Sequence, residues 1–181
     1  VQRFVAPKNE VTIAVCGKYA ELADSYVSVN EALRHAGAAA DARVNIVWIE
    51  TEEFEGEKPK TEALAGADGI LVPGGFGQRG SEGKIKAIQY ARKNDVPLLG
   101  ICFGFQLATV EFARSLGLQE ANSTEIDPST RYPVVDLMPE QAAVETKGAT
   151  MRLGAHEIRI QPGTLAERLY GRRRVWERHR H

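Results

Sequence analysis

The sequence predicts an α/β fold built on an open, mostly parallel sheet with helices on both faces. Short apolar, β-branched segments alternate with segments whose apolar residues recur at helical spacing, and glycine or proline follows several of the strands. Strands that alternate with helices are joined by right-handed crossovers, which cover both faces of a parallel sheet. The strands predicted in this part are residues 11–16, 43–49, 69–72 and 96–101.

Helical spacing is clearest after the first, third and fourth strands. Asp24 or Ser25 can cap the first helix, and Gly37 can close it. The expected helices are residues 26–36, a short segment at 63–67, one that Ser81 can cap and one that follows Cys102.

The alternation ends after about Asn122. Residues 132–138 and 150–160 are typical of strands, without a full helix between them, and residues 164–170 indicate one short helix. We therefore expect a mixed β extension toward the C-terminus. Residues 171–181 hold five arginines against one glutamate.

Composition describes an ordinary globular chain and excludes several classes of function. The 181 residues include 43% hydrophobic residues, 23 Lys+Arg and 24 Asp+Glu, for a formal net charge of −1. A net charge so close to zero gives no electrostatic reason to expect nucleic acid or a membrane as partner. No apolar stretch approaches the roughly 20 residues of a membrane-spanning helix. Two cysteines cannot build a secreted disulfide framework, so we expect a cytoplasmic location.

The most informative segment is residues 96–106, where an apolar strand runs through Gly100-x-Cys102-x-Gly104 directly into a helix. A sharp strand-to-helix turn of this kind holds a nucleophile above the edge of a sheet. The start of a helix also favours the thiolate form of a cysteine, which is the nucleophilic form. The alternative is a buried cysteine that ends a core strand, and the spacing alone leaves both open.

A glycine-rich loop, residues 73–77, follows the third strand. It is expected at the same carboxyl edge as Cys102, where open α/β sheets bind ligands. Its backbone N–H groups can turn toward a developing oxyanion. The alternatives are a flexible loop or a phosphate-binding loop, although neither GxxxxGK[ST] nor GxGxxG is present.

The turn at residues 100–106 and the loop at 73–77 together resemble those of class I (triad-type) glutamine amidotransferases, which have a flavodoxin-like fold. Further segments make the chain most similar to the glutaminase domains of CTP synthases, and the resemblance covers nearly its whole length. Those segments are residues 15–19, 28–33, 121–125, 148–154 and 177–181.

This resemblance implies that residues 1–181 are a glutaminase domain, incomplete at its C-terminus, of an enzyme whose N-terminal synthase domain is absent from the sequence. CTP synthases are ligases that use ATP and Mg to aminate UTP to CTP, with ammonia taken from L-glutamine. The resemblance also implies GTP as an allosteric activator and a homotetrameric full-length enzyme. It implies no cofactor or metal in this domain.

The same resemblance assigns roles to individual residues. Cys102 matches the nucleophile that forms a glutamyl thioester, and Gly75 matches the oxyanion and glutamine-binding glycine. A carboxylate can hold an α-ammonium and a guanidinium an α-carboxylate, which suits Glu125 and Arg180 as the matches for residues that contact the amino-acid head of glutamine. The remaining matches are Phe103, Gly104, Phe105 and Gln106 in the turn that holds glutamine, and Arg79 in the GTP-responsive lid.

One part of the family pattern is missing. The triad histidine and glutamate belong to a His-Pro-Glu segment, yet none of the eight prolines follows a histidine. We therefore expect little or no activity from the 181 residues alone. Two other hypotheses stay open, namely a non-catalytic module that binds glutamine or a partner, and another cysteine hydrolase on the same fold. No third ligand accompanies His179 and His181, so no metal site is expected.

Overall fold

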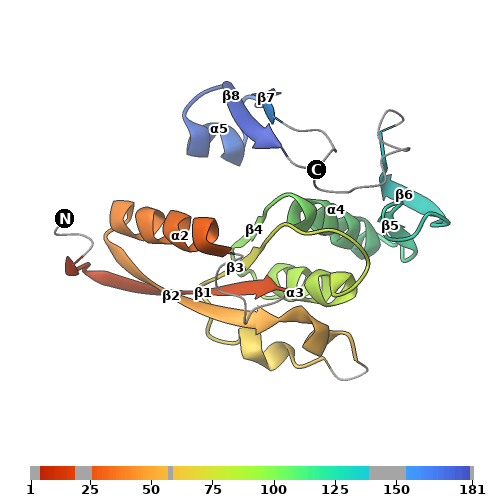
Figure 1. Cartoon of the computed structure of the whole chain (residues 1–181), viewed down its shortest axis with the longest axis horizontal. Coiled ribbons are helices and arrows are strands. Elements are labelled where there is room, and N and C mark those ends of the chain that lie inside the picture. Colours follow the sequence, from red (N-terminus) through yellow and green to blue (C-terminus); the bar gives the residue numbers. More distant parts are fainter. Residues whose placement is uncertain (1–4, 19–25, 57–58, 139–153, 180–181) are drawn as a thin grey trace. The chain divides into compact units, whose positions relative to one another are not determined.

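The computed structural model contains two compact units, which are described separately (Figure 1). The first unit is Val1–Asp136 and the second is Leu137–His181. The structure describes residues 5–18, 26–56, 59–138 and 154–179.

The first unit is built on a four-stranded sheet in the order β2-β1-β3-β4. All neighbouring strands are parallel, with Ile13 opposite Gly69 and Ile70 opposite Leu98. This is the open parallel sheet that the alternating pattern predicts. Its strands are β1 (Asn9–Gly17), β2 (Ala42–Glu50), β3 (Gly69–Val72) and β4 (Leu98–Gly100).

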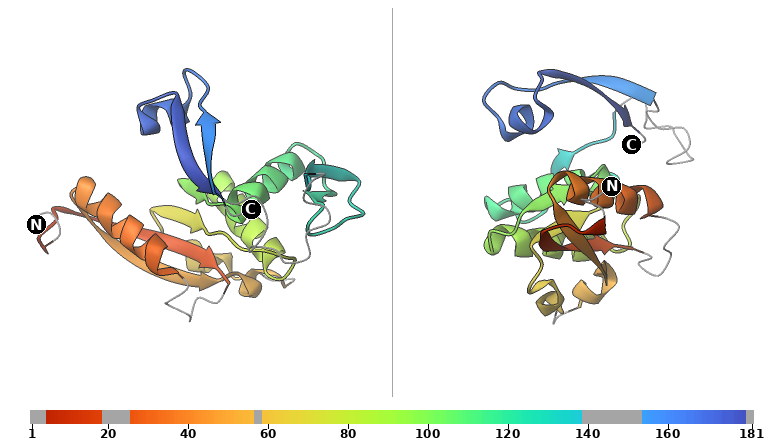
Figure 2. Two further views of the ribbon diagram at one scale, coloured as in Figure 1. Left: turned by 45° about the horizontal axis from the view of Figure 1, so that its top comes forward. Right: turned by 90° about the vertical axis from the view of Figure 1, so that its left-hand side faces the viewer.

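Helices cover the two faces of this sheet, as predicted (Figure 2). The chain moves from β1 outward to β2, then returns across β1 to β3 and on to β4. Because the crossovers are right-handed, this reversal places α2 on one face and α3 on the other. The helical elements are α2 (Val27–Ala39), η2 (Thr51–Phe54), η3 (Thr61–Leu64), α3 (Ser81–Lys93) and α4 (Phe103–Ser115).

The core lies on the face of the sheet covered by α3. Both 3-10 segments contribute to it, through Phe54 and Leu64, and α4 contributes Phe103 and Leu107. By contrast, Gly37 is the only buried residue of α2. The sheet is therefore packed tightly on the side from which the Cys102 turn emerges.

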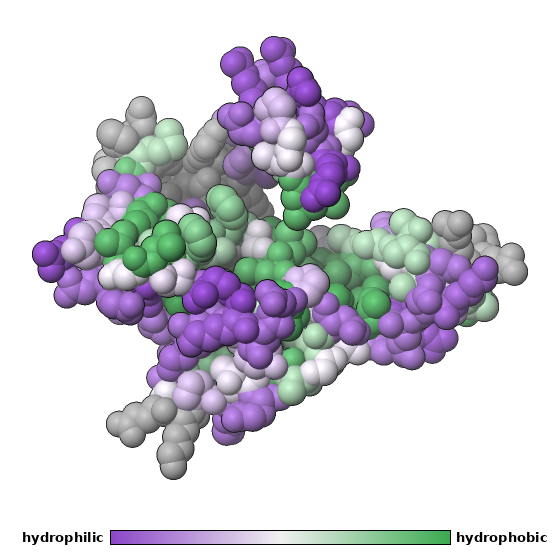
Figure 3. Space-filling model, turned by 180° about the vertical axis from the view of Figure 1, so that it is seen from behind, coloured by the Kyte–Doolittle hydropathy of each residue, from purple (hydrophilic) through white to green (hydrophobic). Residues whose placement is uncertain are grey.

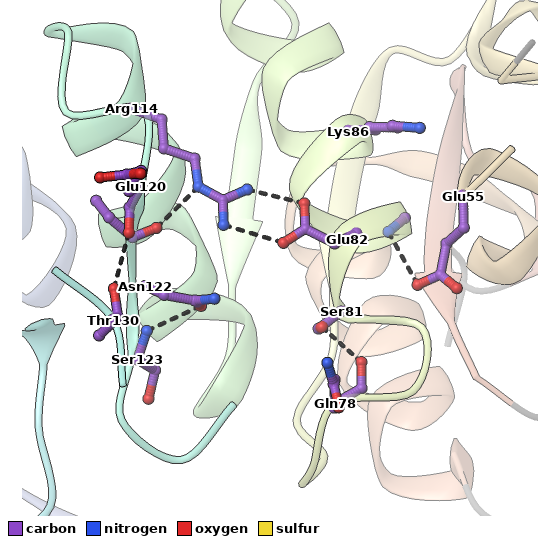
Figure 4. A network of polar contacts seen from close by, with 12 residues as sticks. Glu55, Gln78, Ser81, Glu82, Lys86, Arg114, Glu120, Asn122, Ser123 and Thr130 are labelled. Atoms are coloured by element: carbon purple, nitrogen blue, oxygen red, sulfur yellow. Dashed lines mark hydrogen bonds and ion pairs between the residues drawn. The ribbon is translucent and has the colours of Figure 1, made fainter. Parts of the chain in front are cut away.

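Ion pairs join the elements around this core (Figure 4). Arg114 of α4 binds both carboxylate oxygens of Glu82 on α3, at 2.8 and 3.0 Å. Its Nε also donates to the carbonyl oxygen of Ala121, at 2.8 Å. Arg114 thereby ties α3 and α4 to β5 (Ala121–Ser123).

The C-terminal part has mixed strand pairing, as expected. In the first unit β5 pairs in parallel with β6 (Tyr132–Val135), and in the second β7 (Gly154–Arg159) pairs antiparallel with β8 (Arg174–His179). Among the described residues each pair forms a sheet of its own. Between β7 and β8 lies α5 (Leu165–Tyr170), capped by the side chain of Thr164.

Several local predictions need correction. Gly37 does not close the first helix, because it lies inside α2, where a Cβ would stand 2.6 Å from the carbonyl oxygen of Ala42. The N-cap of α3 is Gly80, with φ 75°, rather than Ser81. The expected caps Asp24 and Ser25 lie outside the described residues.

Strand and helix boundaries also differ from those expected. The predicted strand at 96–101 is reduced to β4, whose leucines are partly exposed. The short segment at 63–67 is the 3-10 turn η3, and strand 150–160 is described only from Gly154. Neither β5 nor β8 was predicted.

Large apolar side chains reach the surface of the first unit, among the hydrophobic residues visible in Figure 3. Leu99 of β4 is 56% exposed, and Phe112 of α4 is 57% exposed. No helix in the described part of the chain is long and apolar enough to cross a membrane.

The ion pair between Arg92 and Glu111 gives a prediction about stability. Glu111 is 2% exposed, and both of its oxygens accept hydrogen bonds from Arg92 at 2.8–3.1 Å. Arg92→Met would leave this buried carboxylate unpaired and should lower the free energy of unfolding by about 2–3 kcal/mol. Urea denaturation measures the change. Arg34→Met, which removes the exposed pair with Glu31, is the control and should change it by less than about 0.5 kcal/mol.

Candidate active site

Cys102 occupies a strained turn between β4 and α4. Its backbone has φ 56° and ψ −112°, and the residue is the N-cap of α4. Its carbonyl oxygen accepts hydrogen bonds from the backbone N–H groups of Phe105 and Gln106, at 3.1 and 3.2 Å. Positive φ at a non-glycine residue is costly and is concentrated at functional sites. This is the geometry expected of a nucleophile elbow.

The glycines on either side of Cys102 are required by close packing. A Cβ on Gly100 would lie 2.7 Å from the backbone of Gly104, and a Cβ on Gly104 would lie 2.0 Å from the carbonyl oxygen of Val72. Side chains at these positions would push α4 away from the strands beneath it. The Gly-x-Cys-x-Gly spacing therefore reflects two backbone contacts that only glycine permits.

The glycine-rich loop at residues 73–77 lies beside this cysteine. A Cβ on Gly74 would stand 3.3 Å from the Cβ of Cys102 and 3.6 Å from its sulfur. On Gly75, a Cβ would be 3.4 Å from the Nζ of Lys84 and 4.0 Å from the ring of Phe103. The two segments singled out from the sequence thus meet at the carboxyl edge of the sheet.

The two cysteines lie in opposite environments. Cys102 is exposed, whereas Cys16 in β1 is completely buried. Burial raises the pKa of the Cys16 thiol to about 12, against a smaller opposing effect from Lys84. Cys16 is a core residue, and Cys102 is the cysteine open to reaction.

Glu125 is connected to the glycine-rich loop. Its carboxylate accepts a hydrogen bond from the backbone N–H of Gly77, at 3.0 Å. Its own N–H donates to the hydroxyl of Ser123 at the end of β5, at 3.2 Å. The carboxylate therefore lies against the loop, although 48 residues separate Glu125 from Gly77.

The four residues after Cys102 differ in exposure. Phe103 is buried in the core, and Gly104 packs on β3, so both support the turn. Phe105 is 66% exposed. The side-chain oxygen of Gln106 is buried and, among the described residues, has no hydrogen-bond partner. Such an oxygen is a ready acceptor for a donor on a bound molecule.

Arg79 follows the loop and is held by Glu52 of η2. Its guanidinium donates to the carboxylate at 3.0 Å, and this hydrogen bond holds the pKa of Glu52 below its usual value. Arg79 also lines an open pocket of about 500 Å³ together with Gln78 and Asn122.

Two further expectations concern Arg180 and metal ions. Arg180 lies outside the described residues. Within the ranges that the structure covers, no three His, Cys, Asp or Glu side chains come together in a way that would hold a metal ion.

Comparison with known proteins identifies the family. The model of the family described as "Glutamine amidotransferase class-I" matches residues 21–181. The chain belongs to this family.

Among the relatives of this glutamine amidotransferase domain are CTP synthases. The CTP synthase of Thermococcus gammatolerans is 61% identical over the whole chain, and that of Methanocaldococcus jannaschii is 58% identical. The chain spans about a third of the length of these relatives, 34% and 35% respectively.

A solved structure is also similar. It is described as the glutaminase domain of Trypanosoma brucei CTPS with bound acivicin, and it matches with a TM-score of 0.85 and 38% identity. The match covers 94% of this chain and 66% of the other.

Sequence reasoning missed two features of this amidotransferase site. One is the hydrogen bond from Gly77 to Glu125, which depends on contact between distant segments. The other is Lys84, which is 3% exposed behind the loop. Its burial could have been inferred from the sequence, because Lys84 stands beside Ile85 and one turn before Ile88, on the apolar face of α3.

The different environments of the two cysteines predict selective alkylation. Brief treatment with iodoacetamide near pH 8 should label Cys102 and leave Cys16 unmodified, because a buried thiol with a pKa of about 12 is neither ionised nor accessible. Peptide mapping measures the labelling. Unfolding in urea before alkylation is the control and should make both cysteines reactive, while preferential labelling of Cys16 in the folded protein would contradict the assignment.

Proposed function

We propose that this chain is the glutaminase part of a CTP synthase and supplies Cys102, on which L-glutamine forms a thioester when the enzyme hydrolyses it. The observation that carries the proposal is the positive-φ turn at Cys102 with the Gly74 backbone beside its sulfur. The identity with CTP synthases over the whole chain supports the choice within the amidotransferase family.

The first chemical step uses the sulfur of Cys102. Its electron pair forms a bond to the amide carbon of glutamine, and the carbonyl π electrons move onto the oxygen. Backbone N–H groups of the loop at Gly74 and Gly75 stabilise this oxyanion, where one preorganised donor is worth roughly 3 kcal/mol. When the oxygen electrons return, the carbon–nitrogen bond breaks, ammonia leaves with an added proton, and a glutamyl thioester remains.

The second step is hydrolysis of this thioester by water, which returns Cys102 and releases glutamate. Both the proton for ammonia and the activation of water require a general acid–base group. The family resemblance assigns that role to the histidine of a His-Pro-Glu segment, which is not among the 181 residues. We accordingly assign the nucleophile, the oxyanion donors and part of the substrate pocket to this chain.

Glutamine recognition falls to polar groups around the elbow. Glu125 supplies a carboxylate beside the loop for the α-ammonium of glutamine, and Gln106 supplies a buried oxygen that lacks a partner among the described residues. Arg180 is proposed to bind the α-carboxylate. The acivicin bound to the Trypanosoma brucei domain, a glutamine analogue, supports a site of this chemistry.

The product ammonia is proposed to serve a synthase domain in the same full-length enzyme. There ATP and Mg would activate UTP for amination to CTP, in a cytoplasmic homotetramer with GTP as activator. Arg79 is the residue of this chain proposed to respond to GTP. In the structure the Arg79 guanidinium donates to the carboxylate of Glu52.

Removal of the nucleophile distinguishes CTP formation from glutamine from CTP formation from ammonia. In the full-length protein, Cys102→Ala should abolish CTP formation from glutamine, because no thioester can form. CTP formation from added ammonia should persist, since the synthase reaction does not use the sulfur. Spectrophotometric assay of CTP with each nitrogen source measures both. Glutamine-dependent activity that survived the substitution would contradict the proposed nucleophile, and loss of both activities would contradict the proposed division of labour.

Glu125 should affect binding more than chemistry. Glu125→Gln keeps an oxygen for the N–H of Gly77 but removes the charge opposite the α-ammonium. A hydrogen bond to a charged group is worth about 1.5–3 kcal/mol, so KM for glutamine should rise roughly 10- to 100-fold. Steady-state glutaminase kinetics measures KM and kcat. Glu120→Gln, an exposed glutamate near β5, is the matched control and should leave KM unchanged, whereas an unchanged KM in Glu125→Gln would remove Glu125 from the pocket.

A further inference from the structure

Lys84 is a buried cation in the core of the first unit. It lies on the inner face of α3 and is 3% exposed, with Ser81, Ile85 and Ile88 buried on the same helix. An ammonium group is expensive to remove from water unless other charges or dipoles compensate it. A methionine has similar length and would fill the same space without that cost. The charge therefore calls for an explanation beyond packing.

The amine of Lys84 lies close to the glycine-rich loop and to the start of α4. Its Nζ lies 3.4 Å from the point where a Cβ on Gly75 would stand, and 5.6 Å from the centroid of the Phe103 ring. Gly75 belongs to the loop that carries the oxyanion donors, and Phe103 is the first residue of α4. The cation thus lies beside Gly75 and the Phe103 ring, which belong to the two segments that frame Cys102.

Burial and the charges around Lys84 determine its pKa. Burial lowers the pKa of Lys84 to about 8, and Lys18 after β1 lowers it further. Cys102, Glu50 at the end of β2 and Cys16 act in the opposite direction, and the influence of Cys102 is the largest of these three. With a pKa of about 8 the amine is mainly protonated at pH 7. Its charge is present below pH 8 and is lost as the pH rises above that value.

We propose that Lys84 is a positioning residue of the glutaminase site, whose buried ammonium fixes the Gly75 loop against α4 and favours negative charge at Cys102. Both the thiolate and the oxyanion of the thioester-forming step place negative charge on this side of the turn. A fixed cation behind the loop stabilises that charge and contacts the substrate only through the backbone. This inference rests on the proposed function, because it adds a residue to the same site.

The test compares Lys84→Met with wild type in the full-length protein, and uses Lys86→Met as the matched control. Lys86 lies on the same helix, and its Nζ donates to the carbonyl oxygen of Gly56, away from the loop. We expect Lys84→Met to lower kcat for glutamine hydrolysis roughly 10- to 100-fold, with KM changed less than about threefold. Lys86→Met should keep wild-type kinetics. CTP formation from added ammonia should be unchanged in both variants.

A second readout distinguishes this role from a purely structural one. The rate at which iodoacetamide alkylates Cys102, measured as a function of pH, gives an alkylation curve that reports how readily the sulfur reacts. Removal of a nearby cation should lower this curve severalfold below pH 8, where the charge of Lys84 is present. The thermal unfolding temperature of Lys84→Met should equal or exceed that of wild type, because methionine avoids the burial of a charge. A residue that merely fills space would leave the alkylation curve in place.

Three outcomes would overturn the inference. One is a wild-type kcat in Lys84→Met, another is an unmoved alkylation curve, and the third is a loss of activity accompanied by a matching loss of thermal stability. Failure of the proposed function has a different signature, since wild-type protein would then hydrolyse no glutamine. In that event the alkylation curve alone still decides whether Lys84 acts on Cys102.

Discussion

The contact between the first turn of α4 and the carboxyl end of β3 determines how the candidate site is arranged. Gly104 lies so close to the carbonyl of Val72 that no side chain fits between them. This contact lets α4 pack directly on the sheet, and Cys102, two residues before Gly104, takes a positive φ of 56° at the N-cap of the helix. Val72 also leads directly into the glycine-rich loop, so one strand end fixes both the sulfur and the backbone beside it.

Polar contacts join α4 and the glycine-rich loop to more distant parts of the first unit. Arg114 connects α3 and α4 to β5, and β5 leads to Glu125, whose carboxylate accepts the N–H of Gly77. The loop is therefore held at one end by the sheet and at the other by a carboxylate from beyond β5. A molecule that displaced the Glu125 carboxylate from Gly77 would remove one of the contacts that hold this loop.

The sequence predicted the parallel sheet and the elbow because their signals are local. Glycines at 100 and 104 encode close backbone contacts that any strand-to-helix turn of this kind needs. Gly37 was misinterpreted because the missing Cβ serves packing against Ala42 rather than a helix end. Strand β8 was missed because its arginines hide the alternation, and its pairing with β7 is visible only in three dimensions. Lys84 was missed because a helical lysine is usually exposed to solvent, although its neighbours Ile85 and Ile88 mark the apolar face of α3.

The backbone conformation of Cys102 has a consequence for which nucleophiles this scaffold can carry. At a φ of 56° a side chain branched at Cβ collides with the neighbouring peptide groups. Threonine, a nucleophile in other hydrolases, is thereby excluded from position 102. Cysteine, serine and aspartate, all unbranched at Cβ, are nucleophilic residues compatible with the turn. Backbone geometry therefore limits which nucleophilic residues can occupy position 102, independently of how reactive they are.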